Sequence, residues 1–212
     1  MKIQTAICLI FALTVVACDN DPVQDAPRAE TKEAVKVAEK PAEEKAAAEV
    51  RAYSFSQEGS SVEFVGAKVT GKHDGKFKKF AGEIKVEGGD PLKGSVQVTI
   101  DMKDFETDTE KLTGHLRSAD FFDVEKFPES KFESTKIEKS AEGFTVTGNL
   151  TLHGVTKSIS FPAKIDVKDD QVDVKAEFGI NRKDFEIVYP GMPDDLIKDE
   201  VLMKLDLKAK KA

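Results

Sequence analysis

The sequence is nearly devoid of cysteine: its 212 residues include only Cys8 and Cys18. Both lie in the first 20 residues, so the rest of the chain excludes disulfide bonds, cysteine-ligated zinc and thiol catalysis. The three histidines, His73, His115 and His153, lack metal-ligand spacing, and no Gly-x-Ser-x-Gly nucleophile sequence is present. The sequence therefore predicts no metal site, no cofactor and no enzyme.

Aromatic side chains with a polar group are also scarce, because the chain has no tryptophan and two tyrosines beside 14 phenylalanines. Thirteen of these phenylalanines follow residue 50, where they add apolar area without a hydrogen-bonding group. This composition fits either a dense core or an apolar cavity. The formal net charge of −7 argues against a nucleic acid as partner.

The N-terminus has the pattern of a bacterial lipoprotein signal. Lys2 precedes an apolar run over residues 3–17, which ends in Val15-Val16-Ala17-Cys18, a lipobox. This run is too short for a membrane-spanning helix, which needs about 20 residues. We therefore expect removal of residues 1–17 and acylation of Cys18, which would anchor the protein in the bacterial cell envelope, on a periplasmic or outer-surface face. The alternative is an ordinary secretory signal with an incidental cysteine.

Residues 18–51 are rich in Ala, Glu, Lys and Pro, and no aromatic residue lies between positions 19 and 50. Such a segment buries too little apolar surface to offset its ordering entropy, so we interpret it as a tether. As a flexible coil, about 30 residues have a root-mean-square span of roughly 30 Å.

From Tyr53 onward the apolar residues alternate with polar ones, which predicts β-strands in a domain over residues 52–212. The expected strands cover residues 62–65, 84–86, 95–101, 144–147, 150–152, 158–161, 165–167, 172–178 and 201–207. One short helix is expected over residues 108–119, with Asp108 as its N-cap. Many short strands favour an antiparallel sandwich or barrel. We expect an all-β antiparallel barrel of about eight strands, which is wide enough either to fill with side chains or to hold one small ligand.

Three segments carry a resemblance to a known family. They are residues 118–128 (SADFFDVEKFP) followed by 131–135 (KFEST), residues 148–157 (GNLTLHGVTK) and residues 178–185 (FGINRKDF). In this order, over residues 52–209 and together with Gly114 to Arg117, the chain closely resembles the YceI family. One departure is Glu186, which follows Phe185 where the family commonly has glycine.

The resemblance implies a lipocalin-like barrel that holds an apolar polyisoprenoid ligand in its lumen. The ligand would be a polyprenyl lipid or the tail of an isoprenoid quinone, and the protein would be periplasmic or secreted. A membrane-anchored lipid-binding protein is thus our first hypothesis. The alternative is a structural or interaction module with a filled barrel and no ligand.

The ligand-lining residues are expected among the inward side chains of the strands and three phenylalanines that close one end. They are Phe64, Ile84, Val98, Ile100, Leu150, Leu152, Phe161, Val174, Phe178 and Ile180 on the strands, with Phe121, Phe122 and Phe127 at the end. For each of them, plain core packing is the alternative.

His115, Arg117 and Arg182 are the candidates for contact with a polar head group, because arginine offers a fork of donors to a pyrophosphate or quinone oxygen. In the alternative reading, Arg117 pairs with Asp120 or Asp123, and Arg182 has structural hydrogen bonds. Structural roles are also favoured for Asn181, His153 and Lys157.

The segment Lys76-Phe77-Lys78-Lys79-Phe80 alternates basic and aromatic residues. It is interpreted as an edge strand with solvated lysines, the alternative being a patch that faces an anionic membrane.

Overall fold

The computed structural model describes residues 20–35 and 49–211, so the predicted cleavage site and Cys18 lie outside the described residues. The described chain is almost entirely β-structure, with helix α1 (Glu110–Arg117) and a 3-10 turn, η1 (Arg182–Phe185). The strands are β1 (Glu30–Glu33), β2 (Val50–Ser56), β3 (Ser61–Lys68), β4 (Gly71–Phe77), β5 (Phe80–Glu87), β6 (Asp90–Asp101), β7 (Phe105–Thr107), β8 (Glu129–Ser140), β9 (Gly143–Leu152), β10 (Val155–Val167), β11 (Gln171–Asn181), β12 (Gly191–Met192), β13 (Asp195–Leu196) and β14 (Glu200–Lys211).

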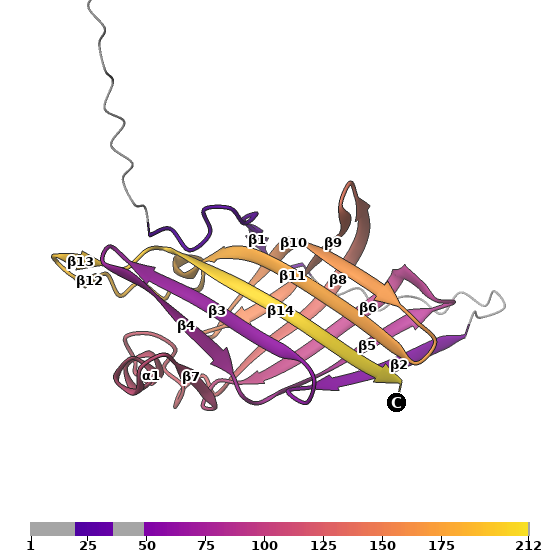
Figure 1. The fold of residues 1–212 in the computed structure, drawn as a ribbon, viewed down its shortest axis with the longest axis horizontal. Coiled ribbons are helices and arrows are strands. Elements are labelled where there is room, and N and C mark those ends of the chain that lie inside the picture. The colour runs from indigo at the N-terminus through magenta and orange to yellow at the C-terminus, as the bar shows by residue number, and fades with distance from the viewer. Residues whose placement is uncertain (1–19, 36–48, 212) are drawn as a thin grey trace, which may run out of the picture.

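Eight of these strands form a closed antiparallel ring in the order β2, β5, β6, β8, β9, β10, β11 and β14, with β14 pairing back onto β2. Figure 1 shows the long strands running around the barrel at a strong tilt. Closure satisfies the backbone hydrogen bonds that an open sheet edge would leave exposed. The structure confirms the expected all-β antiparallel barrel of eight strands with one helix.

At two positions in the barrel wall, two shorter strands follow each other in place of one long strand. Along one edge of β14, residues 210–211 pair with β2, and residues 202–206 pair with β3. At the break between β2 and β3, the Ser60 hydroxyl accepts a hydrogen bond of 3.0 Å from the backbone N–H of Lys208 on β14. β4 and β5 share the neighbouring position in the wall in the same way, because β4 pairs with β3 and β5 pairs with β2. The β3–β4 hairpin therefore builds the wall of one half of the barrel only.

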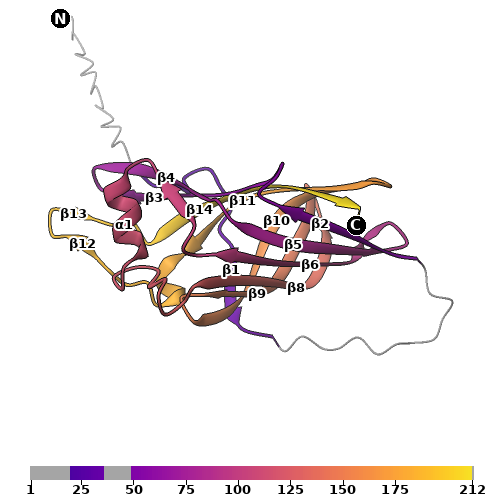
Figure 2. The ribbon, with the colours of Figure 1, turned by 90° about the horizontal axis from the view of Figure 1, so that it is seen from below.

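The two ends of the barrel differ in what covers them. At one end, here called the α1 end, lie the β3–β4 turn, α1, and the loop of residues 186–199 with its small β12–β13 hairpin (left in Figures 1 and 2). The other end, here called the far end, has the β5–β6, β8–β9 and β10–β11 turns and the end of β14.

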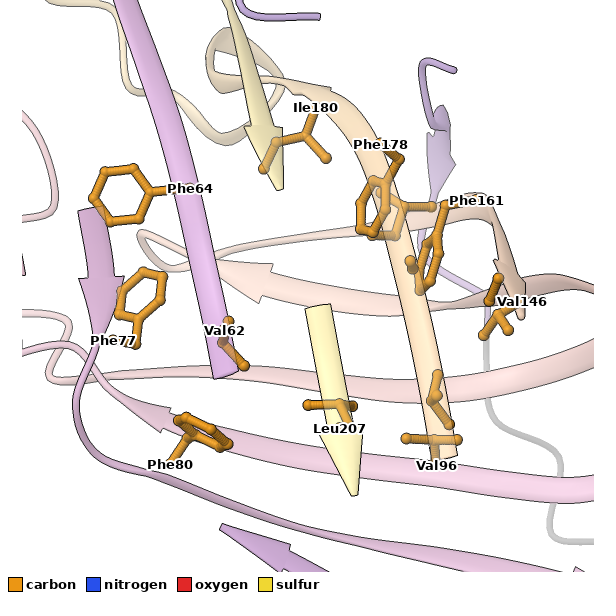
Figure 3. Close-up of a cluster of buried hydrophobic side chains, with 14 of the residues drawn as sticks. Val62, Phe64, Phe77, Phe80, Val96, Val146, Phe161, Phe178, Ile180 and Leu207 are labelled. Carbon is orange, nitrogen blue, oxygen red and sulfur yellow. The ribbon is translucent and has the colours of Figure 1, made fainter. Parts of the chain in front are cut away.

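The far half of the lumen is filled by side chains. Phe161 and Phe178 stack with ring centroids 4.1 Å apart with Val146 beside them, and Val96 and Leu207 lie farther along the lumen (Figure 3). Each of these residues is less than one tenth exposed. This half is an ordinary hydrophobic core, and it accounts for much of the apolar burial that stabilises the barrel.

Helix α1 is shorter than predicted and has a different cap. It begins after Thr109, whose hydroxyl accepts from the backbone N–H of Leu112 at 3.3 Å. Asp108, the expected N-cap, instead has its carboxylate 2.9 Å from Nδ1 of His73 on β4. The β3–β4 hairpin lies close enough to compete for this carboxylate, which a local sequence pattern does not reveal.

Residues 20–35, here called the N-terminal strap, are the main departure from the sequence-based expectation. They were expected to belong to a tether, but β1 pairs antiparallel with β10 from Glu30–Ser160 to Glu33–Lys157. Gly179 of β11 accepts a hydrogen bond from Ala29 and donates one to Pro27, each of 2.8 Å.

The strap fills a gap in the barrel wall. β10 and β11 pair with each other only over residues 164–167 and 172–175, toward the far end. In the other half the strap lies between them and bonds to both, which satisfies backbone groups that a gap would leave without partners. Backbone pairing of this kind needs few apolar side chains, which is why the polar composition was misleading.

One apolar side chain does hold the strap down. Val23 is 0% exposed and packs against Val65 of β3 and Leu202 of β14. It lies over Gly179, where an added Cβ would be 2.7 Å from a methyl carbon of Val23. The absence of a side chain at Gly179 therefore makes the room that the strap occupies.

We expect the substitution Val23→Asp to detach the strap. Loss of the buried side chain should lower the free energy of unfolding by about 2 kcal/mol. The buried site also does not tolerate the charge of an aspartate. Amide hydrogen exchange should speed up at Ser158 and Ser160, on the edge of β10 that β1 covers. Val35→Ala is the control, because Val35 is 52% exposed. Unchanged exchange in Val23→Asp would show that the strap does not depend on this contact.

Candidate functional site

The half of the lumen at the α1 end is hollow. It contains a cavity of about 490 Å³, within the range of roughly 300–1,000 Å³ that is usual for small-molecule sites. Its wall is largely apolar and comes from seven strands (β3, β4, β6, β8, β9, β11 and β14), from α1 and from the loops next to it, including the β12–β13 hairpin. The apolar wall includes Phe64, Ala67, Phe77, Ile100, Met102, Leu112, Leu116, Phe121, Phe122, Leu150, Leu152, Ile180, Ile187, Tyr189, Met192, Ile197, Val201 and Met203.

Seven of the thirteen residues expected to line a ligand border this cavity. They are Phe64, Ile100, Leu150, Leu152 and Ile180 on the strands, with Phe121 and Phe122 in the loop after α1. The strand residues face the lumen because side chains alternate between the two faces of a strand. They reach the cavity because each lies in the part of its strand nearest the α1 end.

The other six do not border it. Ile84, Phe161, Val174 and Phe178 are buried in the hydrophobic core and do not border the cavity, and Val98 is a partly buried side chain packed against that core. Phe127 packs instead on the ring of His153, with centroids 4.8 Å apart. Alternation places a side chain inside the barrel, but it does not show whether that level of the barrel is filled.

Phenylalanine rings make one side of the cavity rigid. The Phe122 ring is edge-on to Phe64 and Phe105, with centroid distances of 6.3 and 5.5 Å. Phe77 lies 5.4 Å from Phe64, and Figure 3 shows these two rings side by side. Edge-to-face pairs of this kind add about 0.5–1.5 kcal/mol each beyond burial. The wall on this side is therefore preformed.

Three rings cluster where the cavity meets the surface. His115 of α1, Phe121 and Tyr189 lie with pairwise centroid distances of 5.0 to 5.2 Å. The His115 ring is oriented through Nε2, which is 3.0 Å from a carboxylate oxygen of Asp120. Of the three expected head-group residues, His115 thus stands at the entrance with a polar edge.

Arg117 does not border the cavity. Its guanidinium donates to the backbone carbonyl of Phe105 at 3.0 Å and lies over the Phe105 ring, 5.2 Å from the centroid. The expected alternative, a pair with Asp120 or Asp123, is also not formed. Arg117 fastens α1 to β7, and this backbone acceptor was not foreseeable from the sequence.

Arg182 borders the cavity but uses its donors within the protein. It is 5% exposed and donates to the carbonyls of Ile187 at 2.6 Å and Lys198 at 3.1 Å, and it pairs with Asp199 at 3.3 Å. Burial lowers the pKa of its guanidinium, although an arginine stays protonated at neutral pH. These contacts match the alternative of structural hydrogen bonds, and they hold the two ends of the 186–199 loop.

The neighbouring polar residues also have structural contacts. Asn181 caps η1 by accepting from the backbone N–H of Lys183 at 3.0 Å, and Lys157 pairs with Glu33 of the strap at 2.6 Å. His153 lies 3.2 Å from the Phe185 carbonyl. Glu186, at the position where the family commonly has glycine, takes the left-handed conformation with φ 60°. The chain therefore keeps the tight turn there with a residue that is strained in it.

A polar pair that the sequence analysis did not identify lies on the cavity wall. Lys68 of β3 and Asp195 of β13 are in contact at 2.5 Å, and the Thr70 hydroxyl donates to the other Asp195 oxygen at 2.8 Å. The hydrogen bond from Lys68 is the main reason why the pKa of Asp195 lies below its usual value. The pair ties the β12–β13 hairpin to β3. No local signal links residues so far apart in the chain.

The Lys76–Phe80 segment does not form a basic aromatic face. Phe77 and Phe80 are 5% and 3% exposed, and they point into the barrel, whereas the lysines are exposed. β4 is flanked by β3 and β7, so it is not an edge strand as expected. The exposed lysines agree with the solvated interpretation.

Within residues 20–35 and 49–211, no three His, Cys, Asp or Glu side chains gather as a metal site would require. The described chain also contains no helix with the length and hydropathy needed to cross a bilayer.

Comparison with known proteins matches the barrel domain to one family. Residues 53–209 match the model of the YceI-like domain. A UPF0312 protein of Serratia proteamaculans is 46% identical over 91 residues, which are 43% of this chain and 47% of that protein. The chain thus spans about half the length of the curated relatives it matches.

Two solved structures share the fold. BcnA of Burkholderia cenocepacia superposes with a TM-score of 0.65 at 25% identity, over 73% of this chain and 98% of BcnA. A domain from Saccharophagus degradans, described as a polyisoprenoid binding domain implicated in plant cell wall breakdown, has a TM-score of 0.61 at 18% identity. That match covers 76% of this chain and 99% of the domain.

Proposed function

This chain belongs to the YceI-like family, and on that basis we propose that its barrel binds a polyisoprenoid chain, either a polyprenyl lipid or the tail of an isoprenoid quinone. The observation that carries the proposal is the cavity of about 490 Å³ with an apolar wall at the α1 end. A barrel filled throughout, the alternative function class, fits the far half but leaves this space without a purpose.

The division of the lumen sets the direction of entry. The buried, stacked rings of Phe161 and Phe178 lie next to the level of the cavity-lining Met203, and with the core beyond them we take the far end to be closed. A chain that enters from the α1 end therefore goes in tail first and leaves its polar group at the entrance. Burial of roughly 600 Å² of ligand surface contributes about 15 kcal/mol before the loss of ligand freedom is subtracted. Micromolar binding needs about 8 kcal/mol, so about 7 kcal/mol remains to offset the lost freedom of ligand and protein.

At the entrance, we assign contact with the head group to His115. Its ring lies between Phe121 and Tyr189 and borders the cavity. Of the other two candidates, Arg117 does not border the cavity, and Arg182 has its donors bonded within the protein. Because Nε2 donates to the Asp120 carboxylate, Nδ1 is the ring nitrogen left for the head group, and the imidazolium form of the ring donates from it to a phosphate or quinone oxygen.

This assignment predicts a difference between two ligands. His115→Ala should weaken binding of a polyprenyl phosphate by at least about tenfold, because a hydrogen bond to a charged group contributes about 1.5–3 kcal/mol. Binding of squalene, which has no polar group, should stay within about twofold. Titration with a fluorescent polyprenyl probe, displaced by each ligand, measures both affinities. Equal losses for the two ligands would point to a damaged cavity, and no loss for either would remove His115 from the head-group site.

We further propose that the protein is a lipoprotein of the cell envelope, acylated at Cys18 after removal of residues 1–17. The support is the sequence Val15-Val16-Ala17-Cys18 at the end of the apolar run. Mass spectrometry of the N-terminal peptide tests this: an acylated Cys18 is expected, and an unmodified mature N-terminus elsewhere would contradict it.

A further inference from the structure

We infer that the α1 end of the barrel docks against the lipid bilayer, so that the cavity entrance faces the membrane. This inference rests on the proposed acylation of Cys18. The occupant of the docking surface is the bilayer itself, because the strap starts at the entrance and exposed apolar side chains surround it.

The strap begins at the entrance. The side-chain amide of Asn20 donates to the backbone carbonyl of Val69, in the β3–β4 turn, at 2.8 Å. Cys18 is only two residues earlier, and two residues span at most about 7 Å. An acyl group on Cys18 therefore enters the bilayer close to this turn. Figure 1 shows the indigo segment starting beside the tip of the β3–β4 hairpin.

The strap cannot swing to the far end without breaking several contacts. The Asp21 carboxylate accepts from the backbone N–H of Val23 at 2.9 Å and from Arg28 at 3.0 Å. Lys72 of β4 donates to the Asp21 carbonyl at 2.9 Å, and the Val23 side chain is fully buried. The expected 30-residue tether would leave the barrel free to tumble, whereas this attachment fixes which end is near the membrane.

Exposed apolar side chains surround the same end. Val69 is 55% exposed and Leu196 is 50% exposed, and their backbones are joined by a hydrogen bond of 3.0 Å. Val188 and Met192, in the same loop as Leu196, are 63% and 62% exposed. Large exposed apolar side chains near a binding site commonly mark an interaction surface. Met192 also borders the cavity, so this surface is continuous with the entrance.

Two pairs of opposite charges lie beside this surface, and Lys111 of α1 borders the cavity without an ion pair in the described part of the chain. Lys68 pairs with Asp195, and Lys183 pairs with Asp199 at 2.9 Å. Among the residues that the structure describes, this surface therefore lacks the uncompensated cluster of lysines and arginines that anionic lipid headgroups select. Apolar contact with the bilayer is the favoured mode, and it should occur on neutral lipid and change little with salt.

The absence of tryptophan from the sequence allows a direct test, because each introduced tryptophan is the only one in the chain. The variants are Leu196→Trp and Val69→Trp at the α1 end, with Leu92→Trp as control. Leu92 is 39% exposed and lies near the start of β6 at the far end. The acylated full-length proteins are reconstituted in phosphatidylcholine vesicles whose acyl chains carry bromine, which quenches nearby tryptophan.

We expect the fluorescence at positions 196 and 69 to fall by at least about half and to shift to shorter wavelength. The signal at position 92 should match that in unbrominated vesicles. Equal quenching at all three positions, or none at positions 196 and 69, would overturn the docking geometry.

Two further measurements separate this inference from the proposed function. Vesicle flotation shows whether the protein is anchored at all, and titration with the polyprenyl probe shows whether the cavity binds. Anchored, probe-binding protein without quenching at position 196 refutes docking alone, whereas failure to float refutes the acylation on which docking depends. Val23→Asp in the Leu196→Trp chain should lower the quenching toward the control level while flotation persists. Unchanged quenching there would show that the strap does not orient the barrel.

Discussion

Leu150→Trp should lower the affinity for a polyprenyl ligand at least tenfold while leaving the stability of the barrel nearly unchanged. Leu150 faces the cavity from β9 and is only partly covered by other side chains. An indole ring there can extend into empty space without displacing a neighbour. If it takes the place of one isoprene unit, the ligand loses roughly 60 Å² of buried surface, which corresponds to about 1.5 kcal/mol and a factor of ten.

Val146→Trp is the matched control, because Val146 lies on the same strand and the same face, four residues earlier. It is 3% exposed and belongs to the packed half. Enlarging it should cost about 1–3 kcal/mol of unfolding free energy, or roughly 2–12 °C in melting temperature. The stability of both variants is measured by thermal melting, and their affinity by titration with the polyprenyl probe. A large loss of stability in Leu150→Trp would mean that the α1 half is packed as densely as the far half.

Gly82→Val should have the largest effect on stability of the substitutions considered. Gly82 of β5 lies opposite Phe55 of β2, and the Phe55 ring covers it. A Cβ at Gly82 would be 2.2 Å from the ring and 2.5 Å from the backbone carbonyl oxygen of Gln97. The backbone oxygen cannot move aside, so the strands must separate locally and Phe55 must leave its site. Loss of a buried phenylalanine typically costs about 3–5 kcal/mol.

Gly66→Ala on β3 is the control, because an added Cβ there meets no atom within 4 Å. Its stability should stay within about 0.5 kcal/mol of the original, or rise slightly through reduced freedom of the unfolded chain. Denaturant unfolding of both variants measures the difference. A Gly82→Val protein as stable as Gly66→Ala would contradict the packing of Phe55 across the β2–β5 pair.

The barrel itself was predictable because its signals are local and repeated. The alternation in residues 95–101 and 172–178 corresponds to parts of β6 and β11, and the three family segments carry the resemblance to a lipocalin-like barrel. β8 was missed since it is dominated by Lys, Glu and Ser, with Phe132 and Ile137 as its large apolar residues. Only the end of β4 was expected, as part of the Lys76–Phe80 edge strand, because Gly71 and Gly75 take positions where a strand pattern needs side chains.

The candidate site was predictable only in part, for a physical reason. Leu150 and Phe161 both belong to inward-facing alternating patterns, yet one borders the cavity and the other is stacked in the core. Which level of a barrel is hollow depends on how side chains from several strands add up, and no single strand contains that information. The roles of Arg182 and Val23 likewise depend on neighbours that are distant in the sequence.

The most direct test of the account is native mass spectrometry of the full-length protein, purified gently from its own membrane and then incubated with a polyprenyl phosphate. We predict one bound apolar molecule per chain, either retained from the cell or taken up in solution, and its loss in Leu150→Trp. A chain that keeps its unliganded mass under both conditions would contradict the claim that the α1 half of the barrel is a lipid site.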